Sequence, residues 1–281
     1  MSAVFGPGGN GDAFAKSGYK SSLDAPRFVK EIGLDAYEYE AGRGLYASDA
    51  MLSSIGSNAK AYGVKMSYHT PYFISLSGID ENVRYKSIGY IRESLDAAKL
   101  LGADIIVVHS GSAAKISRDE AMRLAADTLT KTIESVDTYG IKIGLETMGK
   151  KNQLGTLDEV IELCRLSKDF VPVVDFGHLN ARVCGGAFNS ADDYLRVFDK
   201  IERLVSPEAA NHLHCHFSKI EWTDKGEKKH LTFEDNIYGP NYEIFAEAIA
   251  RGGYSPTVIC ESAGTQAEDA RLIKDKYLEF I

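Results

Sequence analysis

The sequence of 281 residues lacks the features that mark several protein classes. It has only four cysteines, Cys164, Cys184, Cys215 and Cys260. None forms a C-x-x-C motif, so neither a disulfide framework nor a thiolate zinc site is expected. No apolar run reaches the ~20 residues that span a bilayer. The first residues, MSAVFGPGGNG, carry neither the basic nor the apolar region of a signal peptide. We therefore expect a cytoplasmic protein with reduced thiols and no membrane contact.

Positive charge is also scarce. Lys and Arg total 32 against 40 Asp and Glu, which leaves a net charge of −8 at pH 7. This balance argues against a protein that coats nucleic acid with a general basic surface. It does not exclude a local site whose positive charge comes from bound metal ions.

Short apolar, β-branched runs alternate with helical patterns along the whole chain, at an average spacing near 35 residues. This alternation predicts eight strands. They are expected at Ala3–Phe5, Ala36–Tyr39, Val64–Tyr68, Ile105–Val108, Ile141–Leu145, Val171–Val174, His212–Phe217 and Thr257–Cys260. No Pro-, Gly- or Ser-rich linker interrupts the series, so residues 1–281 are expected to form one domain.

The segments between these runs carry helix signals. Ser117–Glu120 and Thr156–Glu159 both have the pattern of a capping box at a helix start. After the first box, apolar residues recur at helical spacing as far as Val136, and Gly140 is placed where a helix-ending glycine belongs. Another apolar stripe predicts a helix between Asn82 and Gly102.

Eight such units predict a parallel sheet covered by helices on both faces. A closed (β/α)8 barrel fits the count. A doubly wound open sheet ranks second, because no G-x-G-x-x-G motif follows a strand and opens a helix.

Six successive strands, beginning with the third, carry a histidine or a carboxylate at or near the carboxyl end. These residues are His69, His109, Glu146, Asp175, His214 and Glu261. In a (β/α)8 barrel such ends converge on the face that carries the active site. Imidazoles and carboxylates without thiolates suit Zn²⁺ or Mn²⁺, and six candidates suggest two or three ions that share a bridging carboxylate. Two metal ions held close together suit the in-line displacement of a phosphodiester.

Four more residues enlarge this set. His178 follows Asp175 by three residues, and Glu227 and His230 lie in the charged segment EWTDKGEKKH. His216 follows His214 by two residues and so lies on the same strand face, where it can ligate or orient a ligand.

Read in order, these motifs resemble the endonuclease IV family of apurinic/apyrimidinic endonucleases, within the xylose-isomerase-like barrels. YHTPY resembles the family's H-x-x-Y, VVHSGS its H-x-G-S and DFGH its D-x-x-H. Glu146 in GLETMG resembles the bridging glutamate. His214 in HCHFSK matches the histidine of H-x-N-D-x-K, and Glu261 resembles the glutamate of the last strand.

The resemblance implies a trinuclear zinc site and hydrolysis, by metal-bound hydroxide, of the DNA phosphodiester 5′ to an abasic site. The implied ligands are His69, His109 and Glu146 for one ion, Glu146, Asp175, His214 and Glu261 for the second, and His178 and His230 with one more carboxylate for the third. Glu146 and Glu261 would be the catalytic carboxylates. The partner would be DNA containing abasic sites, and we expect a monomer with no protein partner.

The substrate-binding residues are expected to be Tyr72, Lys219 and Trp222. Tyr72 matches the family's tyrosine that wedges into the duplex, although an aromatic packed on the barrel rim fits as well. Lys219 belongs to a set of basic residues after strands four to seven that could follow a phosphate backbone. Trp222 could stack a base or a sugar ring, or pack on the rim.

Two departures from the family keep alternatives open. Lys228 is placed where the family has an aspartate ligand, so either Glu227 takes that role or the third metal site is weak. His216-Phe217 replaces the family's Asn-Asp. A metal-dependent sugar isomerase or epimerase, with Glu146 and Glu261 as its proton-transferring pair, is the second hypothesis. A barrel that only binds a ligand is the third.

Overall fold

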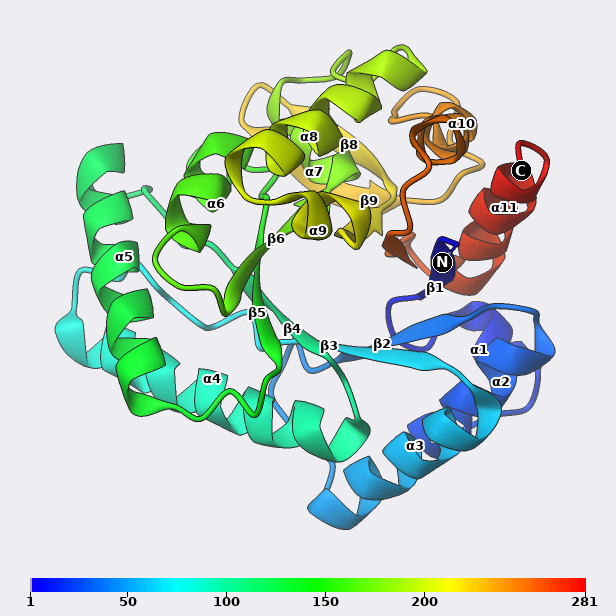
Figure 1. The fold of residues 1–281 in the computed structure, drawn as a ribbon, viewed down its shortest axis with the longest axis horizontal. Helices are drawn as coiled ribbons and strands as arrows, with labels where there is room; N and C mark the ends of the chain where they lie inside the picture. Colours follow the sequence, from blue (N-terminus) through cyan, green and yellow to red (C-terminus); the bar gives the residue numbers. More distant parts are fainter. Residues whose placement is uncertain (1) are drawn as a thin grey trace.

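The computed structural model describes residues 2–281, which form an eight-stranded parallel sheet curled into a barrel and surrounded by helices (Figure 1). The barrel strands are β1 (Val4–Pro7), β2 (Ala36–Glu40), β3 (Lys65–His69), β4 (Ile105–His109), β5 (Lys142–Glu146), β6 (Phe170–Asp175), β7 (His214–Phe217) and β10 (Thr257–Cys260). Their order is β1-β10-β7-β6-β5-β4-β3-β2. This confirms the (β/α)8 architecture, and each expected strand lies within two residues of its observed bounds.

The barrel closes between β1 and β2. Asp35 N donates to Phe5 O over 2.8 Å and Gly9 N donates to Glu38 O over 2.9 Å, so the two strands meet at both ends of β1. Between these bonds the backbones approach so closely that a Cβ on Gly6 would lie 1.7 Å from Ala36 O. Only glycine can occupy that position without moving β1 away from β2.

The helices cover the outside of the barrel. They are α1 (Asp12–Lys16), α2 (Ala25–Glu31), α3 (Asp49–Tyr62), α4 (Glu81–Leu101), α5 (Arg118–Ser135), α6 (Leu157–Cys164), α7 (Phe176–Arg182), α8 (Ala191–Leu204), α9 (Pro207–Asn211), α10 (Tyr242–Gly252) and α11 (Gln266–Leu278), with a 3-10 turn η1 at Ser22–Asp24. Among the described residues, no helix combines the length and the apolar composition needed to cross a bilayer.

The helix starts follow their sequence signals better than the ends do. Thr156 and Glu159 form the expected capping box at the start of α6. At the start of α5, Ser117 accepts from Glu120 N, but the Glu120 carboxylate pairs with Arg123 instead. The helix was expected to continue past Val136 toward Gly140, and this is wrong. Val136 is extended (φ −117°, ψ 148°), because the chain leaves the helix after Ser135 and turns before β5.

The interior of the barrel is apolar only in part. Ile105, Val107 and Val173 form a small cluster separate from the main core, whereas Ile106 and Val108, their neighbours along β4, belong to the main core. This alternation follows from the two-residue repeat of a strand, which directs successive side chains inward and outward. The remaining inward positions near the strand ends carry polar side chains.

A two-stranded antiparallel hairpin, β8 (Lys219–Thr223) and β9 (Gly226–Leu231), follows β7. No strand was expected in this charged stretch. Figure 1 shows the hairpin beside α7, which contacts both of its strands.

Candidate metal centre

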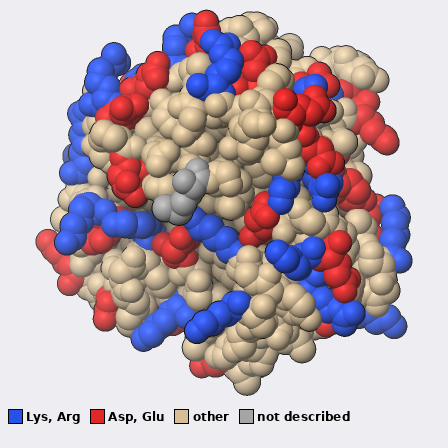
Figure 2. All heavy atoms as spheres, turned by 45° about the vertical axis from the view of Figure 1, so that its right-hand side comes forward, with Lys and Arg blue, Asp and Glu red and all other residues tan. Residues whose placement is uncertain are grey.

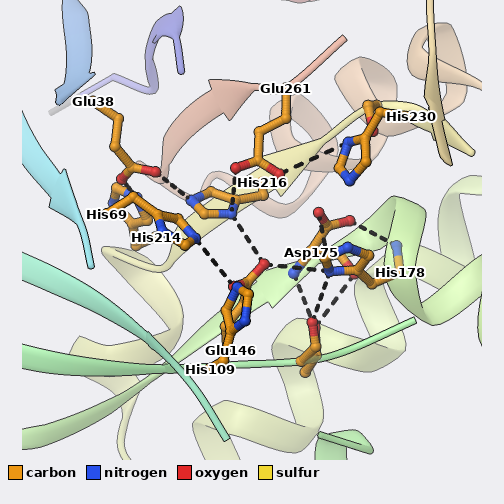
Figure 3. Close-up of polar contacts among 12 residues, drawn as sticks. Glu38, His69, His109, Glu146, Asp175, His178, His214, His216, His230 and Glu261 are labelled. Carbon is orange, nitrogen blue, oxygen red and sulfur yellow. Dashed lines mark hydrogen bonds and ion pairs between the residues drawn. The ribbon is translucent and has the colours of Figure 1, made fainter. Parts of the chain in front are cut away.

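The carboxyl ends of the strands place histidines and carboxylates within contact of one another. His69, His109, Glu146 and Asp175 are the last residues of β3, β4, β5 and β6. Figure 3 shows these side chains turned toward a common region together with those of β2, β7, the hairpin and Glu261. Several sets of these residues have ligand atoms close enough together to hold a metal ion, and three of the sets are described in turn.

The first group consists of His69, His109 and Glu146. Glu146 Oε2 lies 3.5 Å from His69 Nε2 and 3.3 Å from His109 Nε2. His69 Nδ1 is 3.0 Å from Thr70 O, a contact that only an N–H can satisfy. This contact leaves Nε2 with its lone pair facing Glu146, which is the arrangement that metal-binding histidines adopt.

The second group consists of Glu146, Asp175, His216 and Glu261. His216 Nδ1 lies 3.2 Å from Glu146 Oε1 and 3.3 Å from Glu261 Oε1. Glu146 therefore directs one oxygen to each group, as a bridging carboxylate does. His214, expected in this group, is one pleat deeper on β7, and its Nε2 lies 2.9 Å from Glu38 Oε2. The structure thus groups His216, rather than His214, with these three carboxylates.

The third group consists of His178, Glu227 and His230. His178 Nδ1 is 3.0 Å from Thr147 O, and its Nε2 is 3.4 Å from Glu227 Oε2. His178 starts from the first turn of α7, where its backbone N–H donates to Asp175 Oδ1 over 2.7 Å. The helix start therefore fixes His178 relative to the end of β6.

A β-bulge explains how Glu227 and His230 come to share a face. Trp222 pairs with Glu227 and Glu221 pairs with Lys229, so Lys228 is an extra residue without a partner in the β8 register. Three residues apart, Glu227 and His230 would point to opposite faces of a regular strand, but an extra residue reverses the alternation. Lys228 itself points outward and pairs with Glu221 over 2.6 Å.

The hairpin rests on the loop between β5 and α6, residues 147–156. Glu227 N donates to Gly149 O over 3.1 Å, and Lys151 N donates to Lys225 O over 3.0 Å. The loop is held in turn by the guanidinium groups of Arg118 and Arg182, which donate to four of its carbonyl groups, at positions 148, 150, 151 and 153. The position of Glu227 thus depends on contacts outside the barrel.

Two properties of the groups fit a bound cation. Within residues 2–281, Glu146 Oε2 and Asp175 Oδ2 are buried without a hydrogen-bond partner. Buried polar atoms without partners are costly, and a metal ion would satisfy both. In addition, the five His–carboxylate pairs that define the groups lie 3.2–3.5 Å apart. Two ligands of a tetrahedral zinc ion at ordinary bond lengths are separated by about 3.3 Å.

The pKa values of the carboxylates reflect their crowding. Burial, together with the charges of Glu146 and Asp175, raises the pKa of Glu261 to about 8 despite the opposing effect of His216. Burial also raises the pKa of Glu40, which ends β2, to about 7. Burial disfavours the Glu146 anion too, but its histidine neighbours outweigh burial and hold its pKa well below the usual range. A bound cation would relieve the crowding at Glu261.

A cavity of about 880 Å³ opens over the three groups, and His69, His109, Glu146, His178, Glu227, His230 and Glu261 all line it. Tyr72, expected at the substrate site, lines it as well. Its side chain is 59% exposed, and its ring stacks on His109 with centroids 5.5 Å apart. The Tyr72 ring is exposed and lies against two candidate metal ligands, so it can contact a molecule bound in the cavity.

The structure does not bring Lys219 and Trp222 to the residues that line this cavity. Lys219 Nζ donates to the carbonyl groups of Phe233 and Asp235, so it secures the segment after the hairpin. Trp222 packs edge-on against Tyr238, with centroids 5.7 Å apart, and covers Gly185. The geometry therefore supports the rim interpretation for Trp222 and a structural role for Lys219.

Two carboxylates in the barrel were missed by the sequence analysis. Glu38 and Glu40 lie two residues apart on β2, so both point inward. Glu38 is fully buried, and Glu40 lines the cavity. The sequence did carry a signal for these two residues. In A-Y-E-Y-E, two acidic residues occupy the same face of a strand whose two faces are both expected to be buried.

Comparison with known proteins agrees with this architecture. Residues 26–277 match the model of the Xylose isomerase-like TIM barrel family, and the chain therefore belongs to that family. It is 28% identical over 252 residues to an uncharacterized protein from Methanocaldococcus jannaschii, covering 88% of each chain. It is 24% identical over 181 residues to a probable endonuclease 4 from Persephonella marina, covering 63% of each.

Among solved structures, the chain is similar to a D-tagatose 3-epimerase-like protein. The TM-score is 0.68 and the identity 25%, with 90% of this chain and 91% of the other covered. The named relatives thus include a probable endonuclease and an epimerase-like protein, and these names correspond to the two enzyme classes expected from the sequence.

Proposed function

We propose that the protein is a metal-dependent phosphodiesterase that cleaves DNA 5′ to abasic sites. The observation that carries the proposal is the third group, His178, Glu227 and His230, beside two groups that share Glu146. A sugar isomerase or epimerase needs one or two ions to orient a polyol, and it leaves such a third group without a role. The likeness to a probable endonuclease 4 supports the same conclusion.

Divalent cations, zinc or manganese, would activate water and neutralise the phosphodiester when bound to these residues. The histidines and carboxylates of the chain determine where that charge lies. Glu146 belongs to the first two groups, and Glu261 of the second group lies 4.0 Å from Nδ1 of His230 in the third. The three groups therefore surround one space rather than forming independent sites.

Other lining residues can position the substrate. Tyr72 offers an exposed aromatic face next to His109, suited to packing against a sugar or a base. Arg43 and Lys150 also line the cavity and are exposed, so they can contact the flanking phosphates. On the face drawn in Figure 2, cationic and anionic side chains are interspersed, with no broad region of one sign. DNA affinity would then depend on the cavity and its cations more than on a general basic surface.

The test is to incubate the zinc-loaded protein with duplex DNA that contains one tetrahydrofuran abasic analogue. Incision 5′ to the analogue, absent from Glu146→Gln, is the expected result. No incision above that variant would overturn the proposal. Raising the salt concentration should weaken binding to the duplex steeply, because bound phosphates release counterions.

The epimerase hypothesis is favoured by one observation, the 25% identity to a D-tagatose 3-epimerase-like protein over 90% of the chain. In that reading Glu146 and Glu261, both adjoining His216 Nδ1, would transfer protons on opposite faces of a ketose. Manganese-loaded protein incubated with ketohexoses in deuterated water would then incorporate deuterium at the epimerised carbon. Such incorporation without DNA incision would replace the phosphodiesterase proposal.

A further inference from the structure

Glu38 is a buried carboxylate that lies below the metal centre and belongs to none of the three groups described above. It starts from β2, is fully buried, and contacts two histidines of β7 (Figure 3). Strands β2 and β7 are separated in the sheet by β1 and β10, so this contact crosses the barrel interior. An anion at such a position is costly unless it is paired, and the chain provides two imidazoles for it.

The distances between histidine nitrogens and carboxylate oxygens distinguish the contacts of Glu38 from those of the candidate metal ligands. Glu38 Oε2 is 2.9 Å from His214 Nε2, and Glu38 Oε1 is 2.9 Å from His216 Nε2. These separations match an N–H···O contact and are shorter than the 3.2–3.5 Å of the His–carboxylate pairs around the cavity. The two sets of pairs therefore have different roles, although Glu38, His214 and His216 also satisfy a general criterion for a metal group.

His216 joins the two layers of this arrangement. Its Nε2 faces Glu38, while its Nδ1 faces Glu146 and Glu261. The contact between Glu38 Oε1 and His216 Nε2 is close but not aligned, and neither atom has a hydrogen-bond partner within the described chain. At 2.9 Å, Glu38 Oε1 is the acceptor within reach of a proton on His216 Nε2.

We propose that Glu38 is a positioning residue that holds His216 in the tautomer with the proton on Nε2, so that Nδ1 is presented to the metal shared with Glu146, Asp175 and Glu261. His214 is the second support of Glu38, since its N–H occupies the other carboxylate oxygen. A carboxylate behind a metal-binding histidine fixes the ring and increases its basicity, and losing it typically reduces metal affinity about 10- to 100-fold. The inference rests on the proposed metal centre but not on the nature of the substrate.

The test compares zinc binding by the metal-free protein and by Glu38→Gln and His214→Gln, using competition with a chelator and elemental analysis. We expect Glu38→Gln to weaken one zinc equivalent about 10- to 100-fold and His214→Gln to weaken it less, with the maximum number of ions unchanged in both. Unchanged affinity in Glu38→Gln would overturn the proposal. Loss of one whole equivalent in both variants would also overturn it, because Glu38 and His214 would then be ligands of a separate ion.

A second measurement needs no variant and so does not depend on Glu38→Gln folding. Nitrogen-15 NMR of the unsubstituted zinc-loaded protein reports which ring nitrogen of His216 carries a proton. We expect a proton on Nε2 and none on Nδ1, and a proton on Nδ1 would overturn the proposal. Neither measurement uses DNA, so a negative incision assay would leave this inference standing and would reject only the phosphodiesterase proposal.

Discussion

The metal centre is built from two regions that hold their ligands in different ways. His69, His109, Glu146 and Asp175 end consecutive barrel strands. The parallel ladder pairs His69 and Glu146 on both sides, and His109 and Asp175 on one side. Glu227 and His230 lie on the β8–β9 hairpin, which has no ladder with the barrel strands and rests on the 147–156 loop through the bridge between Lys150 and Gly226. The strand-end ligands thus lie on the barrel sheet itself, whereas the hairpin ligands lie on a separate strand pair beside it.

This difference has consequences for stability and for chemistry. Moving a strand-end ligand requires distortion of the sheet, while the hairpin can shift once its bulge or its supporting loop changes. The first two metal groups should therefore tolerate change around the barrel rim, and the third should be sensitive to it. Four substitutions test this contrast, beginning with the one that should have the largest effect.

Glu146→Gln should prevent metal binding at more than one of the three groups. One oxygen of Glu146 faces His69 and His109, and the other faces His216, so the variant removes a negative charge common to two groups. We expect loss of at least two zinc equivalents and a fall in phosphodiester cleavage of roughly 10³-fold or more. Elemental analysis and single-turnover incision measure the two effects.

The matched control is Glu162→Gln, an identical change at an exposed position of α6. It should retain the full zinc content and rate. If Glu146→Gln bound as much zinc as this control, the two groups would not share Glu146 as a bridge, and the strand-end region would be less integrated than the distances indicate.

The strand-end region is also the part that the sequence predicted well. Apolar runs indicate where strands end, and parallel strands bring those ends to one face. The sequence alone therefore predicts that His69, His109, Glu146 and Asp175 lie together. The choice between His214 and His216 could not be made this way. Both point inward from β7, and only the depth of each residue in the barrel decides which one meets Glu146.

The hairpin region was beyond the sequence analysis. EWTDKGEKKH is too polar and too short to indicate a strand pair, and the bulge at Lys228 depends on the register with β8. Glu227 was therefore one of two alternatives, and the structure places it with His178 and His230. Glu38 was missed because its partners lie 176 and 178 positions further along the chain, on a strand that is not its neighbour.

Glu227→Gln should remove one ion and leave the other two. Its Oε2 faces His178 Nε2, and it contributes nothing to the groups that share Glu146. We expect a loss of one zinc equivalent and a rate reduction about 10- to 100-fold, smaller than that of Glu146→Gln. Lys228→Gln is the control. The Lys228 side chain is next to Glu227 in sequence but points outward, so this variant should retain every ion. Equal zinc content in both variants would exclude Glu227 as a ligand.

Gly226→Ala should disturb the same group indirectly. Gly226 has φ +89°, and a Cβ there would lie 2.3 Å from Gly149 O, at the point where the hairpin touches the 147–156 loop. The added methyl group must displace the hairpin relative to the loop. We expect Glu227 to shift with it and one zinc ion to bind more weakly, by up to about tenfold. Gly186→Ala has a similar φ of +77° but no atom within 4 Å of the new Cβ, and it controls for backbone strain alone. Matching zinc affinities in the two variants would contradict the supporting role of the loop.

The smallest expected effect concerns the ion pair that anchors this loop. Glu159 accepts from Arg118 over 2.5 and 2.7 Å and from the backbone N–H groups of Gly155 and Thr156 over 2.9 Å. Burial would raise the pKa of Glu159, but these contacts outweigh it and lower the pKa to about 2. A depressed pKa means that the folded state favours the anion. The stabilisation is therefore present above the unfolded pKa of about 4.3 and is lost as the pH falls from there toward 2.

Glu159→Gln should consequently lower the free energy of unfolding by about 1–2 kcal/mol at pH 7, a value reduced for the partial exposure of Arg118. Urea unfolding of both proteins between pH 7 and pH 3 measures this difference, which should shrink steadily below about pH 4.3. Other carboxylates titrate equally in both proteins, so the difference isolates Glu159. Hydrogen exchange should show the loss of protection first in β8 and β9, whose support is the 147–156 loop, and not in β3–β6. Equal loss across the barrel strands would mean that the hairpin is as firmly integrated into the fold as the strand ends, and the contrast between the two regions would fail.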